Sequence, residues 1–196
     1  MSVSPATPLL LASISPQRRA ILEQLRIPFD VVAPRYDEHD AIQNPVELVR
    51  GHALGKARSV HGEAGDRPVL GVDTAVVVDG HAFGKPAGPE DAEQMLEALS
   101  GRTHEVVSGL CLLTRAWEEV VHETTRVTFR ALTPRDIAHY IREEEWRDRA
   151  GAYAIQGLGA SLVERIEGDY LNVVGLPGPL LVRLLGERFA GVYGFG

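Results

Sequence analysis

The segment PLLLASISPQRRAILEQL, residues 8–25, decides how the fold begins. Its apolar first part, residues 8–12, predicts a buried strand, and Pro16 is a favoured first residue of a helix. Arg18 then shares a helical face with three apolar residues, Ile21, Leu22 and Leu25. Burying an unpaired charge costs free energy, so we expect the Arg18 side chain to point into a cleft or to pair with an acid. The nearby helix N-terminus, with its free N–H groups, suits a phosphate.

The rest of the chain alternates predicted strands with predicted helices. We expect strands at 29–33, 69–72, 75–78, 105–113, 120–129 and 161–166, with an Asp79-Gly80 hairpin and a long hairpin between the fourth and fifth strands. Helices should follow the caps Asn44 and Thr133, cover 89–99, and begin after Pro177. This order predicts an α/β fold with a mixed central sheet and flanking helices, formed by residues 1–196 as one domain.

Composition narrows the class of protein. A net charge of −7 argues against general nucleic-acid binding, although a local positive pocket can still hold an anionic substrate. The sequence shows neither an apolar run of membrane-spanning length nor a targeting segment, so we expect a cytoplasmic protein without a membrane partner. The single cysteine, Cys111, lies in an apolar run and is interpreted as a buried strand residue.

Lysine is rare in this chain. Of 20 Lys and Arg residues only two are lysines, Lys56 and Lys85, and each follows a glycine. A compact, flexible ammonium is not interchangeable with a planar guanidinium, and phosphate binding is one place where the difference matters. Lys56 should lie at the edge of the apolar stripe of the second helix, where its stem is buried and its ammonium reaches a neighbouring pocket. Chance under a compositional bias is the competing explanation.

Two acids are candidates for a metal site. Asp73 stands at the predicted carboxyl end of the strand 69–72, and Glu38 belongs to the acidic stretch 37–40. Either one alone is more typical of a cap or a solvated loop. Together with the nearby cations they suit Mg²⁺, or Mn²⁺, which carboxylates hold alongside substrate phosphates. The seven histidines show no pair at zinc-ligand spacing.

Two glycine patterns are rejected as nucleotide motifs. The segment GHALGKA, residues 51–57, has three residues between its glycines where a phosphate loop has four, lacks the final Ser or Thr, and lies within a predicted helix. The segment GLGASL, residues 157–162, ends in Leu where a dinucleotide fingerprint needs Gly or Ala. A dinucleotide-dependent oxidoreductase is therefore not expected.

Six segments in order resemble the Maf family of nucleoside triphosphate pyrophosphatases. They are LASISPQRRAIL at 11–22, GVDT at 71–74, GKP at 84–86, LSGRTH at 99–104, GAYAIQG at 151–157 and EGDYLNVVGLP at 167–177. The resemblance extends from about Leu9 to Leu185. It implies a two-lobed α/β fold around a cleft, related to the inosine triphosphate pyrophosphatases, and often a homodimer.

The resemblance also implies a reaction and a set of roles. Water attacks the α-phosphorus of a nucleoside triphosphate, releasing the monophosphate and pyrophosphate, and a carboxylate orients or deprotonates that water. By resemblance Asp73 is the catalytic residue and, with Glu38, lies at the metal. The implied phosphate-binding residues are Ser15, Arg18, Lys56 and Lys85.

Base preference follows from three further positions. Gln156 matches the glutamine of family members that prefer dTTP and UTP, and its amide can donate and accept at the imide edge of a pyrimidine. Thr74 matches a second specificity position. Gln17 replaces the first arginine of the usual Ser-Pro-Arg-Arg, which removes a cation linked to substrate choice and puts a strict dTTP/UTP preference in doubt. The alternative function is a nucleotide-binding regulator of cell division or septum formation without significant turnover.

Overall fold

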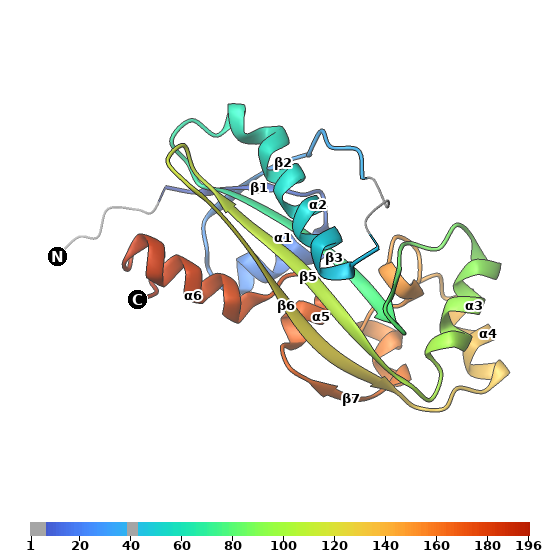
Figure 1. Cartoon of the computed structure of the whole chain (residues 1–196). Coiled ribbons are helices and arrows are strands. Elements are labelled where there is room, and N and C mark those ends of the chain that lie inside the picture. The colour runs from blue at the N-terminus through green and yellow to red at the C-terminus, as the bar shows by residue number, and fades with distance from the viewer. Residues whose placement is uncertain (1–6, 39–42) are drawn as a thin grey trace.

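The computed structural model describes residues 7–38 and 43–196 (Figure 1). The described strands are β1 (Leu9–Ala12), β2 (Phe29–Val32), β3 (Val69–Val78), β4 (His81–Phe83), β5 (Thr103–Leu113), β6 (Glu118–Phe129) and β7 (Val163–Glu167). The described α-helices are α1 (Pro16–Gln24), α2 (Pro45–Val60), α3 (Pro89–Leu99), α4 (Pro134–Arg142), α5 (Tyr170–Val174) and α6 (Gly178–Phe189). Three short 3₁₀ helices are η1 (His61–Glu63), η2 (Ala150–Ala152) and η3 (Gly157–Leu162).

Helix starts lie where local capping chemistry predicts them. The Asn44 side chain accepts hydrogen bonds from the backbone N–H groups of Val46 and Glu47, and Pro45 is the first residue of α2. Thr133 and Asp136 form a reciprocal capping box at the start of α4. These contacts satisfy backbone donors that a helix leaves free, which explains why both predicted boundaries are confirmed.

The seven strands form one mixed sheet in the order β2-β1-β3-β5-β6-β7, with β4 also paired to β3. Strand β1 runs parallel to β2 and β3, whereas β3, β5, β6 and β7 are successively antiparallel. The predicted α/β class with a mixed sheet is confirmed, as are both predicted hairpins. Cys111 lies fully buried in β5, as predicted.

Strand β3 corrects one prediction. The sequence predicts one strand that ends before Asp73 and a second that begins at residue 75, but β3 continues without a break to Val78. It continues because β5 pairs with it from Val69 to Val77, whereas β1 pairs with it only as far as Gly71. Asp73 therefore lies within the strand, just beyond the end of its parallel neighbour.

Helices cover both faces of the sheet (Figure 1). Helix α2 packs over β3 and β5 on one face, and α1 and α6 share an apolar cluster with β1, β3 and β5 on the other. A second large cluster joins α3, α4 and the far parts of β3, β5 and β6. The helix α5 was not predicted, and it lies on the face opposite α2, with residues in contact with both large clusters.

Candidate active site

Helix α2 lies unusually close to the sheet because two glycines face it. A Cβ atom at Gly71 of β3 would lie 2.1 Å from the carbonyl oxygen of Ala53, and one at Gly109 of β5 would lie 2.2 Å from that of Val49. Glycine at both positions lets the helix backbone approach the strands directly. Gly109 is also the cross-strand partner of Asp73, so the approach brings the middle of α2 onto Asp73.

A short cation–carboxylate cluster results. The Lys56 Nζ atom lies 2.5 Å from Asp73 Oδ1 and 2.6 Å from Glu38 Oε1. The side chains of Lys56 and Asp73 are only 9% and 12% exposed, whereas that of Glu38 is 51% exposed. The structure thus brings together three residues that the sequence placed in separate segments. The predicted position of Lys56, with its stem buried on α2, is confirmed.

Asp73 is held as a carboxylate. Its burial favours the neutral acid, but hydrogen bonds from His52 and Lys56 and the charges of Lys56 and Arg18 outweigh that effect and lower its pKa. Asp73 is therefore ionised at neutral pH. A carboxylate with a lowered pKa is a weaker base than usual, but it remains a strong acceptor for a cation or for the hydrogen of a water molecule.

Sequence reasoning missed His52. This residue is 3% exposed, and its Nδ1 atom lies 3.3 Å from Asp73 Oδ2, opposite the oxygen that Lys56 contacts. The available signal was its spacing, because His52 and Lys56 are four residues apart and share a face of α2. The ring of Tyr36 meets that of His52 edge-on, with centroids 5.8 Å apart.

Arg18 reaches the same point from the other face of the sheet. Its guanidinium donates to the carbonyl oxygen of Gly175 at 2.9 Å, to Ser13 Oγ at 3.1 Å and to Thr74 Oγ1 at 3.5 Å. Thr74 follows Asp73 along β3 and therefore points to the opposite face, where its hydroxyl also contacts Ser108 Oγ at 2.8 Å. Burial lowers the pKa of Arg18, while Asp73 and Glu38 raise it, and a guanidinium remains charged.

Among the described residues, one edge of β3 is unpaired between its two neighbouring strands on that side. Pairing of β3 with β1 ends at Gly71, and pairing with β4 begins at Val76. Between these points, residues 72–75 of β3 have no strand beside them on that edge within the described parts of the chain. Asp73 and Thr74 both lie in this gap, so groups from either face can meet a ligand there.

Ser15 and Gln17 lie at the N-terminus of α1, beside Arg18. Ser15 is the N-cap residue, and its hydroxyl donates to Gln17 Oε1 at 3.1 Å. The first turn of α1 contains no acidic residue, and an N-terminal turn carries partial positive charge. The structure therefore places both residues at a point suited to an anion.

Lys85 and Gln156 are not in contact with the cluster around Asp73. Both side chains are exposed, Lys85 in the loop after β4 and Gln156 at the N-cap of η3. A backbone hydrogen bond of 3.0 Å from Gly151 to Gly84 ties these two segments together. They belong to the α3 end of the molecule, so a ligand would have to bridge them to the cluster.

The donor set fits a divalent cation. Ligand atoms of Glu38, His52 and Asp73 all lie within 4.8 Å of one another, and two of the three residues carry carboxylates. The ammonium of Lys56 contacts one oxygen of each carboxylate, which leaves their other oxygens for a metal. Two residues of the predicted acidic stretch, His39 and Asp40, lie outside the described residues.

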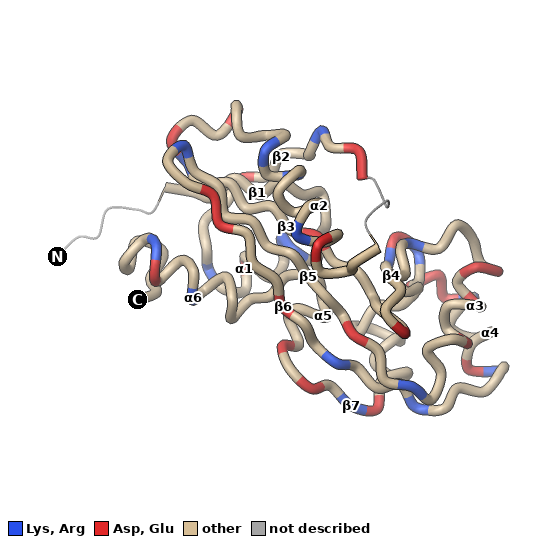
Figure 2. The backbone as a smooth tube through the Cα atoms, viewed as in Figure 1, with Lys and Arg blue, Asp and Glu red and all other residues tan. Residues whose placement is uncertain are grey.

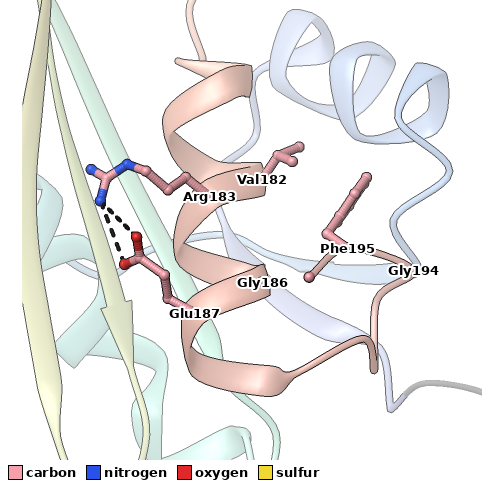
Figure 3. A pocket seen from close by; sticks show the side chains of 7 residues that line it. Val182, Arg183, Gly186, Glu187, Gly194 and Phe195 are labelled. Carbon is pink, nitrogen blue, oxygen red and sulfur yellow. Dashed lines mark hydrogen bonds and ion pairs between the residues drawn. The ribbon is translucent and has the colours of Figure 1, made fainter.

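Other surfaces offer less chemistry. Basic and acidic residues are interspersed along the described backbone (Figure 2). A hollow between α6 and the C-terminal residues is lined by Val182, Gly186, Phe195 and the ion pair of Arg183 with Glu187 (Figure 3). Helix α6 packs on the face opposite α2, so this hollow is separate from Asp73. None of the described helices combines the length and apolarity needed to cross a membrane.

Comparison with known proteins finds relatives that match most of this chain. The sequence is 48% identical over 180 residues to the dTTP/UTP pyrophosphatase of Gloeobacter violaceus, covering 91% of this chain and 95% of that protein. It is 41% identical over 196 residues to the dTTP/UTP pyrophosphatase of Deinococcus radiodurans, covering 100% of both. A solved structure, that of the Staphylococcus aureus Ham1 protein, aligns over 63% of this chain and 72% of that one. The sequence identity is 14% and the TM-score is 0.43, so the structural similarity is weak.

The family profile described as Maf-like protein matches residues 8–188. That span contains the cluster of Lys56, Asp73 and Glu38, the Arg18 segment, and the loops of Lys85 and Gln156. With this match, and with relatives of similar length above 40% identity, the chain belongs to the Maf-like protein family.

Proposed function

We propose that this chain is a nucleoside triphosphate pyrophosphatase that releases the monophosphate and pyrophosphate, with dTTP and UTP as its preferred substrates. The observation that carries the proposal is the gap at residues 72–75 of β3. There a buried carboxylate is paired with Lys56 on one face, and the charge of Arg18 stands on the other. Two similar relatives bear the name dTTP/UTP pyrophosphatase, which supports both the reaction and the substrate.

Arg18 supplies positive charge for the phosphates. Its three hydrogen-bond acceptors are neutral oxygens, and it has no ion pair among the described residues. The charge is therefore oriented but not neutralised by direct contact. Ser15 and the first turn of α1 lie beside it, so a triphosphate bound along the gap meets several donors, and one that extends to the loop after β4 would also meet Lys85.

Asp73 positions the attacking water. As a carboxylate it accepts a hydrogen bond from that water and so aims the oxygen lone pair at the α-phosphorus. Lys56 is held between Asp73 and Glu38 until the substrate binds, and its flexible ammonium then contacts a phosphoryl oxygen. Glu38 and Asp73 would hold a divalent cation, and two carboxylate ligands suit Mg²⁺ or Mn²⁺. When bound, such a cation neutralises charge on the phosphates.

We assign base selection to Gln156 and Gln17, and we expect Thr74 to act on it only indirectly. Gln156 is exposed and can present its amide to the imide edge of thymine or uracil. The hydroxyl of Thr74 is already engaged with Ser108, so its contribution is to hold Arg18 and the gap in place. A Gln17→Arg exchange should alter the relative rates among bases, and an identical profile would remove Gln17 from base selection.

The decisive experiment measures pyrophosphate release from canonical and modified triphosphates in the presence of a divalent cation. We expect turnover that is highest with dTTP and UTP, and loss of turnover in Asp73→Asn with nucleotide binding largely retained. Asp66→Asn is the control, because the Asp66 side chain is 91% exposed and its ion-pair partner is Arg115, in the turn between β5 and β6. Binding without release from any nucleotide would refute the enzymatic proposal and favour the regulatory alternative.

A homodimer and a cytoplasmic location are also part of this proposal. Sedimentation of the purified protein tests the first, since a monomer at micromolar concentration would contradict it. Cell fractionation tests the second. Electrophoretic mobility assays with DNA and RNA test the expectation that nucleic acid is not a partner.

A further inference from the structure

His52 has a buried imidazole at the centre of the site. Its exposed fraction is 3%, and it projects from α2, whose backbone is seated on the sheet at Gly71 and Gly109. The Nδ1 atom faces Asp73 Oδ2 at 3.3 Å. Because α2 is in close contact with the sheet and the His52 ring is buried between them, the ring has little room to move.

The two carboxylate oxygens of Asp73 have different partners. Lys56 Nζ lies 2.5 Å from Oδ1, whereas His52 Nδ1 lies 3.3 Å from Oδ2. Ligation of a cation by Oδ2 and Nδ1 would therefore leave the contact between Lys56 and Oδ1 in place. One ligand atom from each of Glu38, His52 and Asp73 lies within 4.8 Å of the other two. That span is about twice a metal–ligand bond of roughly 2.1 Å, so all three groups can share one ion.

Packing around the ring fixes its orientation. The Tyr36 ring stands edge-on to His52 at an interplanar angle of 63°. Tyr36 can take this place because Gly55 lies beneath it, and a Cβ atom at Gly55 would lie 2.2 Å from the Tyr36 ring. His52 is thus held between Asp73 and Tyr36, with Nδ1 directed at the carboxylate. This is the arrangement that a preformed nitrogen ligand requires.

We propose that His52 is the third protein ligand of the divalent site, and that this donor set of two carboxylates and one imidazole selects Mn²⁺ or Co²⁺ over Mg²⁺. Mg²⁺ strongly prefers oxygen ligands in near-ideal octahedral geometry and keeps several waters. Imidazole favours first-row transition ions, and affinity for a mixed nitrogen and oxygen site rises from Mn²⁺ to Co²⁺. The inference rests on the proposed function only in taking over its divalent cation.

The test is direct detection of nitrogen ligation in the metal-free, full-length protein loaded with Mn²⁺ alone. Pulsed electron paramagnetic resonance should show ¹⁴N modulation from a bound imidazole in the wild type. The variant His52→Asn places an amide near the position of Nδ1 and can still donate to Asp73, so it removes the imidazole with little loss of packing. We expect it to lose the modulation, and His139→Asn on the exposed face of α4 to keep it.

Calorimetric titration with Mn²⁺ and with Mg²⁺, without nucleotide, gives the second readout. In His52→Asn the Mn²⁺ affinity should fall by about tenfold or more, the order of loss that follows when a metal site is disturbed, while Mg²⁺ affinity changes little. Absence of ¹⁴N modulation in the wild type, or equal Mn²⁺ affinity in wild type and variant, would overturn the proposal. Failed nucleotide turnover with intact nitrogen ligation would instead refute only the proposed function.

Discussion

The close seating of α2 on the sheet can be tested by adding one methyl group. In Gly109→Ala the new Cβ atom lies 2.2 Å from the Val49 carbonyl oxygen, 2.4 Å from its carbonyl carbon and 2.7 Å from the backbone nitrogen of Arg50. All three atoms belong to the helix backbone, so no side-chain rotation relieves the overlap. Either the helix or the strand has to move.

The size of the effect follows from these distances. Ordinary contact begins at 3.4 Å, so α2 has to retreat by about 1 Å. Overpacking of a core costs about 1–3 kcal/mol, and replacing a strand glycine recovers roughly 0.5–1 kcal/mol of that cost. For a chain of this length, the net loss of up to about 2.5 kcal/mol lowers Tm by up to about 10 °C. Because His52 and Lys56 move with α2, a shift of about 1 Å should reduce turnover by on the order of 100-fold.

Thermal unfolding and steady-state pyrophosphate release on the same preparation measure both effects. Gly62→Ala is the matched control, because Gly62 follows α2, has no atom within 4 Å of the position that a new methyl group would take, and does not adopt a left-handed backbone. We expect that control to keep wild-type turnover and stability or to gain slightly. Wild-type turnover in Gly109→Ala would show that the helix-to-sheet distance does not govern the site.

Three further predictions concern separate features. Lys56→Met leaves the buried Asp73 carboxylate without its ammonium partner, so the free energy of unfolding measured in urea should fall by about 3–5 kcal/mol. Burial lowers the pKa of His104 to about 4, below its unfolded value of about 6.5, so the folded state resists protonation of this ring. The free energy of unfolding should therefore be highest above pH 6.5 and should fall by about 3 kcal/mol as the pH drops to 4. His104→Gln should remove this part of the pH dependence in unfolding measured as a function of pH. The Glu145 carboxylate accepts backbone N–H bonds of 3.0 and 3.1 Å from Leu158 and Gly159 of η3, whose N-cap is Gln156, so Glu145→Gln should narrow the difference in kcat/KM between dTTP and dATP.

Local chemistry explains which parts of the fold were predictable from sequence. Asn44 and Thr133 fix their helix starts through side-chain hydrogen bonds within three residues, and the Asp79-Gly80 turn needs only its own backbone, with φ of 50° and 80°. The continuity of β3 was not predictable in this way. It depends on pairing with β5, whose partner residues lie between 28 (Val77 and Glu105) and 44 (Val69 and Leu113) positions further along the chain.

In the site, too, residue types were predictable from sequence, whereas the contacts between them were not. Lys56 and Asp73 could be named as candidates because residue type and position suited an anion and a metal. Their contact depends on Gly71 and Gly109, which let α2 approach the strands, and no single segment contains that information. His52 was missed for the same reason, since its role is apparent only once the strand beneath α2 is known.

The rarity of lysine now has a structural reason at position 56. Its ammonium contacts one oxygen on each of two carboxylates, Asp73 from β3 and Glu38 from the segment after β2, while its stem is buried on α2. A guanidinium is larger and planar, and it binds best when both nitrogens meet one carboxylate in a fork. Here the side chain is 9% exposed, and the two acceptors come from different segments. Arginine would keep the charge at position 56 but would have to displace either Glu38 or α2, so Lys56→Arg should impair turnover even though the net charge of −7 is unchanged.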